Sequence, residues 1–352
     1  MSEWKECTLG DIVTFQRGFD ITKKEQFPGS YPVVSSSGIN SYHNAYKVKC
    51  PGVVIGRKGT LGTVFYLNKD FWPHDTTLWV KNFHGNYPLF IFYFLKGYNF
   101  QQYDVGSSNP TLNRNHIHLL PSLIPPLPEQ RAIASVLSSL DDKIDMLHRQ
   151  NKTLEAMAET LFRQWFVEEE DEGWEEGKLG NCASVTTGKG LKRHEFIDNG
   201  MYPVLGANGE IGRTNNYLTD DRLILTGRVG TLGKVIISDD KVWISDNVLI
   251  VKPNKIKYFY PIYFILKRTE FENLNVGSTQ PLVTQTDLKN INFILPHNYI
   301  LENFENNCLI YYEKKSKNDT QIRTLEKLRD TLLPKLMSGE VRVKLEQEGG
   351  GI

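Results

Sequence analysis

The residues of this chain that could do chemistry begin with a glycine-rich segment that occurs twice. Residues 56–62 read G-R-K-G-T-L-G, and 171 positions later the chain reads G-R-V-G-T-L-G. The spacing matches neither a Walker loop nor the dinucleotide-binding fingerprint, so nucleotide binding is not expected and the glycines more simply serve tight turns. The two arginines, Arg57 and Arg228, are candidates either for phosphate contacts or for structural pairs with Asp75 and Asp246 respectively.

A histidine beside an aspartate is the next pair of interest, because His74 and Asp75 have the residue types of a general-base dyad. The equivalent of the histidine in the second copy is Ser245, so a catalytic role common to both copies is not expected. The 8 histidines show no metal-ligand spacing, and no metal site is expected. The N-P-P-[FY] motif of methyltransferases is absent. The chain is therefore expected to have no catalytic activity of its own.

A long internal repeat surrounds these segments. At an offset of 171, Tyr-Pro-Val at 31–33 recurs at 202–204 and Trp72 recurs as Trp243, while near the start of the chain the offset is 170. A period of this length indicates two copies of a whole globular unit rather than a solenoid. Such a chain can place two similar surfaces on one elongated or symmetric partner.

Each copy is predicted to be a β-rich α+β domain. Short β-type runs such as 52–55 and 222–225 are separated by Gly- and Asn-rich turns, as is typical of that class. The apolar segments 89–96 and 262–267 fit a buried helix or a strand equally well by periodicity, and we expect helices.

Composition limits the class of protein. Net charge is zero, but residues 1–127 carry 12 Lys+Arg against 8 Asp+Glu, residues 174–300 carry 15 against 13, and residues 128–173 carry 5 against 11. The two bodies are thus mildly basic, which is a weak footprint for a nucleic-acid binder. The 4 cysteines are scattered and no apolar run approaches membrane-spanning length, so we expect reduced thiols, no membrane association and a cytoplasmic protein.

A long helix is predicted to follow each body. The first begins after Pro125-Pro-Leu-Pro-Glu-Gln and continues as a heptad seam, in which a buried Asn151 would fix the register of helix pairing. The first seam consists of Ile133, Leu137, Leu140, Ile144, Leu147, Asn151, Leu154, Ala158, Leu161 and Trp165. We expect this helix to pair with its repeat as an antiparallel coiled coil.

The second seam is rougher than the first. It has a polar centre at Lys315 and Asn318, and Pro334 is expected to kink or end the helix. Its members are Phe304, Cys308, Tyr311, Lys315, Asn318, Ile322, Leu325, Arg329, Leu332 and Leu336.

Three segments together resemble the specificity subunit (HsdS) of type I restriction-modification systems. They are P-P-L-P-E-Q-R-A-I-A from 125, L-F-R-Q-W-F from 161 and L-L-P-K-L-M-S-G-E-V from 332, and the paired G-R-x-G-T-L-G adds to them. The resemblance implies two target recognition domains (1–127 and 174–300), a central spacer helix with an acidic linker (128–173), and a distal spacer helix with a tail (301–352). It also implies a pseudo-two-fold internal repeat.

The same resemblance implies the partners. Each domain would read one half of a bipartite site on double-stranded DNA, and the helices would set the spacing of the halves. The helices would also dock two modification (methyltransferase) subunits, and a restriction (motor-nuclease) subunit would join them. S-adenosylmethionine and ATP with Mg would be bound by those partners and not by this chain. The second helix lacks the P-L-P-E-Q start of the first, so the two ends are expected to dock partners unequally.

Comparison of the two copies predicts which residues touch DNA. Shared residues are expected to hold the scaffold or contact phosphates, and differing polar residues are expected to read bases, because base contacts carry the sequence information. The DNA-binding candidates are Gln16, Arg17, Ser36, Ser37, Arg57, Lys58, His74, Thr76, Ser108, Asn109, Lys189, Lys192, Arg193, Asn208, Arg228, Ser245, Asn247, Thr279 and Gln280. The alternative to this function is a coiled-coil scaffold that carries two carbohydrate- or protein-binding β domains.

Overall fold

The computed structural model describes residues 4–104, 110–169, 171, 173–229, 232–274 and 282–344, without the side chain of Phe293. The chain divides into two compact units. Unit 1 consists of Met1–Leu147 and Thr320–Ile352, and unit 2 consists of His148–Asp319. Each unit therefore combines one globular body with a segment of each long helix.

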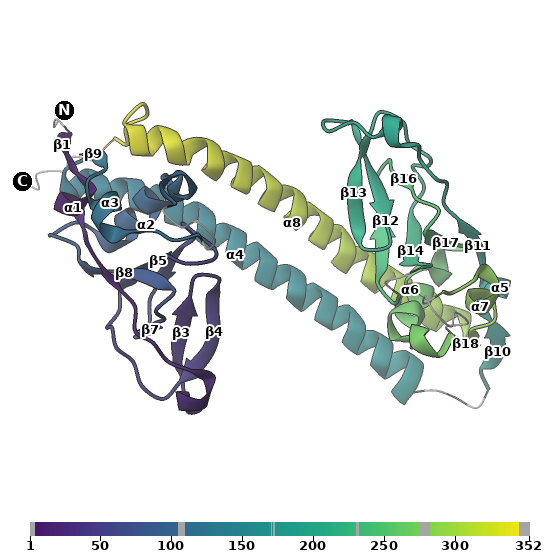
Figure 1. Ribbon diagram of the computed structural model, residues 1–352. Coiled ribbons are helices and arrows are strands. Elements are labelled where there is room, and N and C mark those ends of the chain that lie inside the picture. Colours follow the sequence, from purple (N-terminus) through teal and green to yellow (C-terminus); the bar gives the residue numbers. More distant parts are fainter. Residues whose placement is uncertain are drawn as a thin grey trace, which may run out of the picture. The chain divides into compact units, whose positions relative to one another are not determined.

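Unit 1 contains three small sheets (Figure 1). Their strand orders are β2-β8-β5-β6, β4-β3-β7 and β1-β9, and β3 pairs parallel with β7 whereas the other pairs are antiparallel. The strands and short helices are β1 (Lys5–Thr8), α1 (Leu9–Ile12), β2 (Thr14–Arg17), η1 (Lys23–Glu25), β3 (Tyr31–Ser35), β4 (Gly38–His43), β5 (Gly52–Gly56), β6 (Val64–Leu67), β7 (Trp72–Pro73), β8 (Thr77–Asn82), α2 (Pro88–Lys96), η2 (Phe100–Tyr103), α3 (Arg114–His118) and β9 (Pro121–Ile124).

Unit 2 repeats this arrangement with the strand orders β11-β17-β14-β15, β13-β12-β16 and β10-β18. Its elements are β10 (Glu175–Lys178), α5 (Leu179–Cys182), β11 (Ala183–Thr187), η4 (Arg193–Glu195), β12 (Tyr202–Gly206), β13 (Gly209–Thr214), β14 (Leu223–Gly227), β15 (Val235–Ser238), β16 (Trp243–Ile244), β17 (Val248–Pro253), η5 (Ile256–Tyr258), α6 (Phe259–Arg268), η6 (Phe271–Leu274), α7 (Gln285–Lys289) and β18 (Asn292–Leu295). The β-rich α+β class and the internal repeat are confirmed, and so are the helices expected at 89–96 and 262–267.

The unbroken apolar run of β5 is explained by burial on both faces. Val53 and Ile55 belong to the core that contains α2, whereas Val54, between them, packs with Val34 and Phe71 under the three-stranded sheet. Alternate residues of a strand point to opposite faces, so a strand between two cores needs apolar residues at every position. In unit 2, β14 is divided between two cores in the same way.

Two long helices carry the predicted seams. Helix α4 extends over Leu127–Arg163 and continues as the π-helical turn Gln164–Glu168, and α8 extends over Asn298–Ser338. Every residue of both predicted seams is buried or half-buried. Within unit 1, Ile144 and Leu147 pack with Ile322 and Leu325. Within unit 2, the rings of Phe162 and Phe166 pack against Phe304 in tilted and edge-on arrangements. Rising numbers on α4 meet falling numbers on α8, so the paired segments are antiparallel in each unit.

A polar cluster interrupts the apolar seam within unit 2. Asn151 is 7% exposed, donates from Nδ2 to Asp319 Oδ1 at 2.6 Å and accepts from Asn318 Nδ2 at 2.8 Å. Asn318, at 1% exposed, also donates to Gln150 Oε1 at 2.8 Å, and Lys315 Nζ lies 3.1 Å from Asp319 Oδ2. Asn151, which was predicted to fix the helix register, is thus buried and bonded to a specific partner, Asn318, on the facing helix.

The start of α4 is held by the polar residues of its P-L-P-E-Q segment. Glu129 is 2% exposed and accepts from Trp4 Nε1 at 3.1 Å and from Arg342 Nη2 at 2.7 Å. Gln130 accepts from the main-chain N–H of Tyr87 at 2.9 Å and donates to Asn86 Oδ1 at 2.8 Å. This segment therefore has an internal structural role in unit 1, because it joins Trp4 and Arg342 to the start of the helix.

Pro334 was expected either to kink or to end the second long helix, and it does not end it. The helix continues to Ser338, because Leu332, Leu333, Leu336 and Met337 pack on the core of unit 1 and hold the last turn in place. The 4 cysteines are free. Among the helices of the described ranges, none has both the length and the apolar character that crossing a membrane requires.

Candidate nucleic-acid interface

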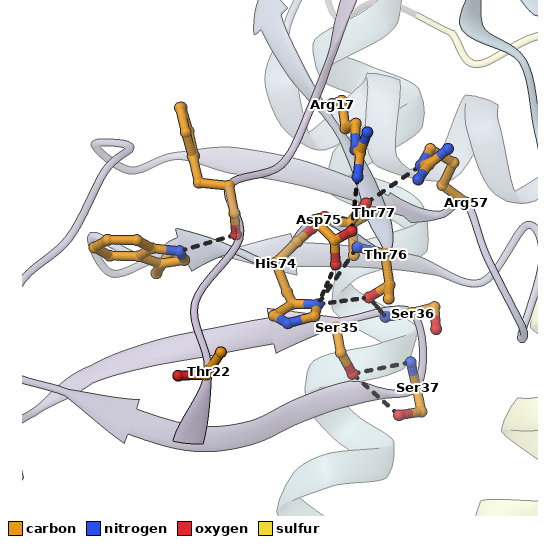
Figure 2. A network of polar contacts seen from close by, with 12 residues as sticks. Arg17, Thr22, Ser35, Ser36, Ser37, Arg57, His74, Asp75, Thr76 and Thr77 are labelled. Atoms are coloured by element: carbon orange, nitrogen blue, oxygen red, sulfur yellow. Dashed lines mark hydrogen bonds and ion pairs between the residues drawn. The ribbon is translucent and has the colours of Figure 1, made fainter. Parts of the chain in front are cut away.

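In unit 1 several predicted DNA-binding residues meet at the turn between β7 and β8 (Figure 2). This turn, residues 74–76, lies against the end of β2, the turn after β3 and the residue that follows β5. It brings Arg17, Ser36, Arg57, His74 and Thr76 into one hydrogen-bonded network. Their positions in the sequence are far apart, and the pairing of β2 with β8 and of β5 with β8 joins them.

Asp75 is the centre of this network. Its Oδ2 accepts from Arg17 Nη2 at 2.8 Å, and its Oδ1 lies 3.1 Å from His74 Nδ1. Partial burial alone would raise the pKa of Asp75, but the hydrogen bond from Arg17 and the neighbouring charges of His74, Arg17 and Arg57 outweigh it, and the net effect is a lowered pKa. Asp75 is therefore ionised at neutral pH and fixes one edge of the Arg17 guanidinium.

His74 and Thr76 connect the turn to the β3–β4 hairpin. The Thr76 hydroxyl lies 3.1 Å from His74 Nδ1 and accepts from the Ser36 main-chain N–H at 3.3 Å. The Ser36 side chain is only 8% exposed, whereas Ser37 is exposed and its hydroxyl donates to Asn40 Oδ1 at 3.4 Å. Of these two serines, Ser37 has the side chain that a ligand can reach.

Arg57 contacts main-chain carbonyls of the same turn. Its Nε donates to the Asp75 carbonyl oxygen at 3.2 Å, and its own N–H donates to the Thr76 carbonyl at 2.9 Å. Burial and the nearby Arg17 charge lower the pKa of Arg57, although Asp75 opposes the shift. Of the two roles predicted for Arg57, the structural contact with Asp75 is present, but Arg57 bonds the main-chain carbonyl of Asp75 and not its carboxylate. Lys58 is exposed, and its N–H also donates to the Thr76 carbonyl, at 3.1 Å.

Both units hold this turn with the same main-chain frame. The hydrogen bond from Arg57 N to the Thr76 carbonyl recurs as one from Arg228 N to the Asn247 carbonyl at 2.9 Å. A glycine is required beneath each turn, because a Cβ on Gly18 would stand 2.0 Å from the His74 carbonyl oxygen and a Cβ on Gly188 would stand 2.3 Å from the Ser245 carbonyl oxygen. The scaffold is thus shared, and the side chains mounted on it differ.

In unit 2 the turn keeps the aspartate, as Asp246, but has Ser245 in place of His74 and Asn247 in place of Thr76. Ser245 is 7% exposed and its hydroxyl accepts from the Asn247 N–H at 3.2 Å, while the Asn247 side chain is exposed. Arg228 is half-buried, and its Nε has no hydrogen-bond partner among the described residues. No ion pair within 4.0 Å joins Arg228 to Asp246 among the described residues, so the pairing predicted as one option for Arg228 is not observed.

The remaining candidates of unit 2 that the structure describes are exposed. Lys189 follows β11, and its carbonyl accepts from Trp243 Nε1 at 2.8 Å. Lys192 and Arg193 are at the start of η4, and the Asn208 carbonyl in the β12–β13 turn accepts from Lys234 Nζ. In unit 1, Gln16 is half-buried on β2. Ser108, Asn109, Thr279 and Gln280 lie outside the described residues.

The structure also places residues at the site that the sequence comparison did not select. A hollow of about 510 Å³ next to Arg17 and Asp75 is lined by Phe19, Asp20, Lys47 and Trp72. Lys47 Nζ lies 4.7 Å from the Trp72 ring centroid. At the equivalent positions of unit 2 the chain has Lys189, Gly190 and Leu218 in place of Phe19, Asp20 and Lys47. Phe19, Asp20 and Lys47 could therefore have been selected from the sequence, because each differs from its equivalent in the second copy.

Asp20, His74 and Asp75 have ligand-type atoms within 4.8 Å of one another. Such a trio could hold a cation, but Asp75 is already bonded to Arg17, and His74 Nδ1 already faces Asp75 and Thr76. These contacts within the described residues account for Asp75 and His74 without an ion.

Comparison with known proteins identifies the class to which this arrangement belongs. A family model described as the type I restriction modification DNA specificity domain matches residues 1–156 and 171–319. The chain belongs to this family. Each matched range covers one body and the first part of the long helix that follows it.

Individual relatives agree with this assignment. The chain is 27% identical to the type I restriction enzyme MjaIX specificity subunit of Methanocaldococcus jannaschii, over 72% of this chain and 69% of that protein. It is 23% identical to the MjaVIII specificity subunit of the same organism, over 97% of this chain and 94% of that protein. The crystal structure of a type I restriction-modification S subunit from M. genitalium has the same fold, with a TM-score of 0.71, 18% identity and coverage of 95% and 96% of the two chains.

Proposed function

We propose that each unit of this chain reads one half of a bipartite sequence on double-stranded DNA, as the non-catalytic specificity subunit of a type I restriction-modification complex. One observation carries the proposal. The turn at 74–76 and the turn at 245–247 have the same main-chain frame, yet the first presents His74 and Thr76 beside Arg17, and the second presents Ser245 and Asn247 beside Thr187. A pair of readers for different sequences needs this combination of constant frame and variable side chains.

Charge supports contact with a polyanion. The first body carries 12 basic against 8 acidic residues and the second carries 15 against 13, so each has a small positive excess. A small excess supplies little non-specific affinity. We therefore infer that partner subunits contribute much of the phosphate contact, and that this chain contributes the sequence preference.

The helix segments support a role in spacing and assembly. Antiparallel pairing in each unit, with the buried Asn151–Asn318 contact, fixes the helix register. We infer that the fixed register sets the separation of the half-sites and that the exposed faces of the helices dock two modification subunits and, through them, a restriction subunit. The cofactors S-adenosylmethionine and ATP with Mg belong to those partners in this proposal, and methyl transfer or cleavage needs them.

The test uses the chain co-expressed with the modification subunit of its own host. The purified complex is expected to methylate a bipartite motif with an unspecified spacer, and sequencing of the methylated bases reads that motif directly. Duplex affinity should fall linearly with salt on a log–log scale, because bound phosphates release counterions. The purified chain alone should transfer no methyl group. A complex with no sequence preference, or a chain that binds no duplex with its partner present, would favour the scaffold function instead.

A further inference from the structure

The side chain of Arg17 lines the hollow in unit 1, and one edge of its guanidinium is already bonded to Asp75. Arg17 is the last residue of strand β2, its side chain is 58% exposed, and its Nη2 donates to Asp75 Oδ2 at 2.8 Å. No second partner holds the guanidinium among the described residues. Arginine has five N–H donors in a planar fork, so the outward edge is left able to donate two parallel hydrogen bonds.

The clamp behind Arg17 is itself fixed. Asp75 Oδ1 lies 3.1 Å from His74 Nδ1, and the Asp75 carbonyl accepts from Arg57 Nε at 3.2 Å (Figure 2). Holding a long side chain before a ligand arrives reduces the entropy that binding must remove. The network therefore prepares the fork of Arg17 for a planar partner.

Fold stability does not explain Arg17. Strand β11 pairs with β17 in unit 2 as β2 pairs with β8, although the residue equivalent to Arg17 is Thr187. Asp246 is present in unit 2 at the position of Asp75, so the acid does not require the arginine for this fold. An ion pair with an arginine as exposed as this one contributes little to stability.

A phosphate is a poor partner for this arginine. Asp20, His74 and Asp75 have polar atoms within 4.8 Å of one another, so two carboxylates stand beside the guanidinium. Their charges offset part of the attraction that Arg17, Arg57 and Lys47 would exert on a phosphate, whereas the major-groove edge of guanine is uncharged and offers two acceptors, O6 and N7. The spacing of those acceptors matches the arginine fork.

We propose that Arg17, clamped by Asp75, reads a guanine in the DNA half-site of unit 1 by donating to its O6 and N7. The hollow lined by Phe19, Asp20, Lys47 and Trp72 gives the edge of the base pair room to approach. Lys47, held over the Trp72 ring, adds a positive charge to the lining of the hollow for the flanking backbone. This inference rests on the proposed function and adds to it one base and the residue that reads it.

The test is a specificity profile of the complex of this chain with its modification subunit, measured on a library of randomised duplexes. The wild-type complex is expected to require guanine at one position of one half-site. Arg17→Thr introduces the residue that unit 2 tolerates at this place, so the fold should survive. It should reduce the preference for guanine at that position by about 10-fold to 100-fold and leave the other half-site unchanged. Arg114→Thr, at an exposed arginine of α3, is the matched control and should leave the motif unchanged.

A second measurement keeps the proposal testable if the variant is inactive. Replacing that guanine with 7-deazaguanine removes N7 and should weaken methylation by the wild-type complex, and Arg17→Thr should be insensitive to the replacement. Asp75→Asn should weaken the guanine preference at the same position, because Asp75 positions Arg17.

Three results would overturn the inference. An unchanged motif in Arg17→Thr would show that the arginine is structural. Uniform weakening on all sequences with a shallower salt dependence would show a phosphate contact. Insensitivity of the wild-type complex to 7-deazaguanine at every guanine of the motif would show that no such contact exists. All three leave the proposed function standing, whereas a wild-type complex without any motif would remove both.

Discussion

The buried polar contact between α4 and α8 gives the most quantitative prediction. Replacing Asn151 with Leu removes two hydrogen bonds, to Asp319 at 2.6 Å and from Asn318 at 2.8 Å. A bond to a charged group contributes about 1.5–3 kcal/mol and a neutral one about 0.5–1.5 kcal/mol. Burial of the leucine side chain stabilises the helix pair by about 1.5–3 kcal/mol. In the variant, Asp319 still pairs with Lys315 and Asn318 still donates to Gln150. We therefore expect the free energy of unfolding to fall by about 1 kcal/mol.

Asn318→Leu should cost about as much, since it leaves Asn151 Oδ1 without its donor in a buried place. The double variant removes both members of the pair. It should recover most of the loss, because two facing leucines leave no orphaned amide, and the coupling between the sites is expected to be about 1–2 kcal/mol.

The assay is amide hydrogen exchange across residues 147–158 in the full chain, which reports local stability without requiring two-state unfolding. A loss of about 1 kcal/mol accelerates exchange roughly fivefold at 25 °C. Each single variant should show this acceleration, and the double variant should return to the wild-type rate or below it. Lys152→Leu, on an exposed position of α4, is the control and should change little. If the double variant exchanges at the product of the two single effects, the two asparagines do not act as a pair and the reasoning is wrong.

Three further predictions concern stability, recognition and spacing. Burial raises the pKa of Glu305 from 4.5 to about 7, so the folded chain binds this proton more tightly than the unfolded chain, and stability is lost as pH rises from about 4.5 to about 7. Glu305→Gln should therefore match the wild-type Tm at pH 4 and exceed it at pH 7.5 in scanning fluorimetry. An equal difference at both pH values would contradict this assignment. Gly18→Ala places a Cβ 2.0 Å from the His74 carbonyl oxygen, so it should displace the 74–76 turn and abolish recognition of one half-site in methylation assays. The control is Gly85→Ala, which should keep the motif. Its Cβ meets nothing within 4 Å, although its φ of +80° makes the substitution strained for the backbone. Removing one heptad from each of α4 and α8 should shorten each by about 10 Å and the methylated motif's spacer by about three base pairs; an unchanged spacer with retained activity would show that the helices do not measure DNA.

The features predicted correctly from sequence are those with a local period or an internal copy. The seam from Ile133 to Trp165 was visible because helical neighbours recur every three or four residues, and Asn151 stood out as the polar member of an apolar stripe. The 171-residue repeat gave the two bodies and their class for the same reason, since two copies of one chain segment adopt one fold.

The features that sequence could not give depend on pairing between distant strands. Arg17 meets Asp75 only because β2 lies beside β8, and no local pattern encodes that neighbour. Comparison of the copies selected Arg17, His74 and Thr76, which the structure brings together. It passed over Phe19 and Lys47, although both differ between the copies, because an aromatic and a lone lysine do not by themselves suggest a shared hollow.

Pro334 shows a local rule overridden by tertiary packing. Proline removes one helical hydrogen bond and disfavours the preceding turn. The apolar residues on both sides of it are buried against the core of unit 1, and this burial outweighs the local cost for the last four residues of α8.

The central claim is that each body reads its own half of the target, and exchange of one body tests it most directly. Residues 1–127 would be replaced by the corresponding body of a family member with a different known motif, and the complex with the modification subunit would be profiled by sequencing of methylated bases. The account predicts that one half of the motif changes to that of the donor while the other half and the spacer stay as they are. A motif in which both halves change together, or neither does, would contradict it.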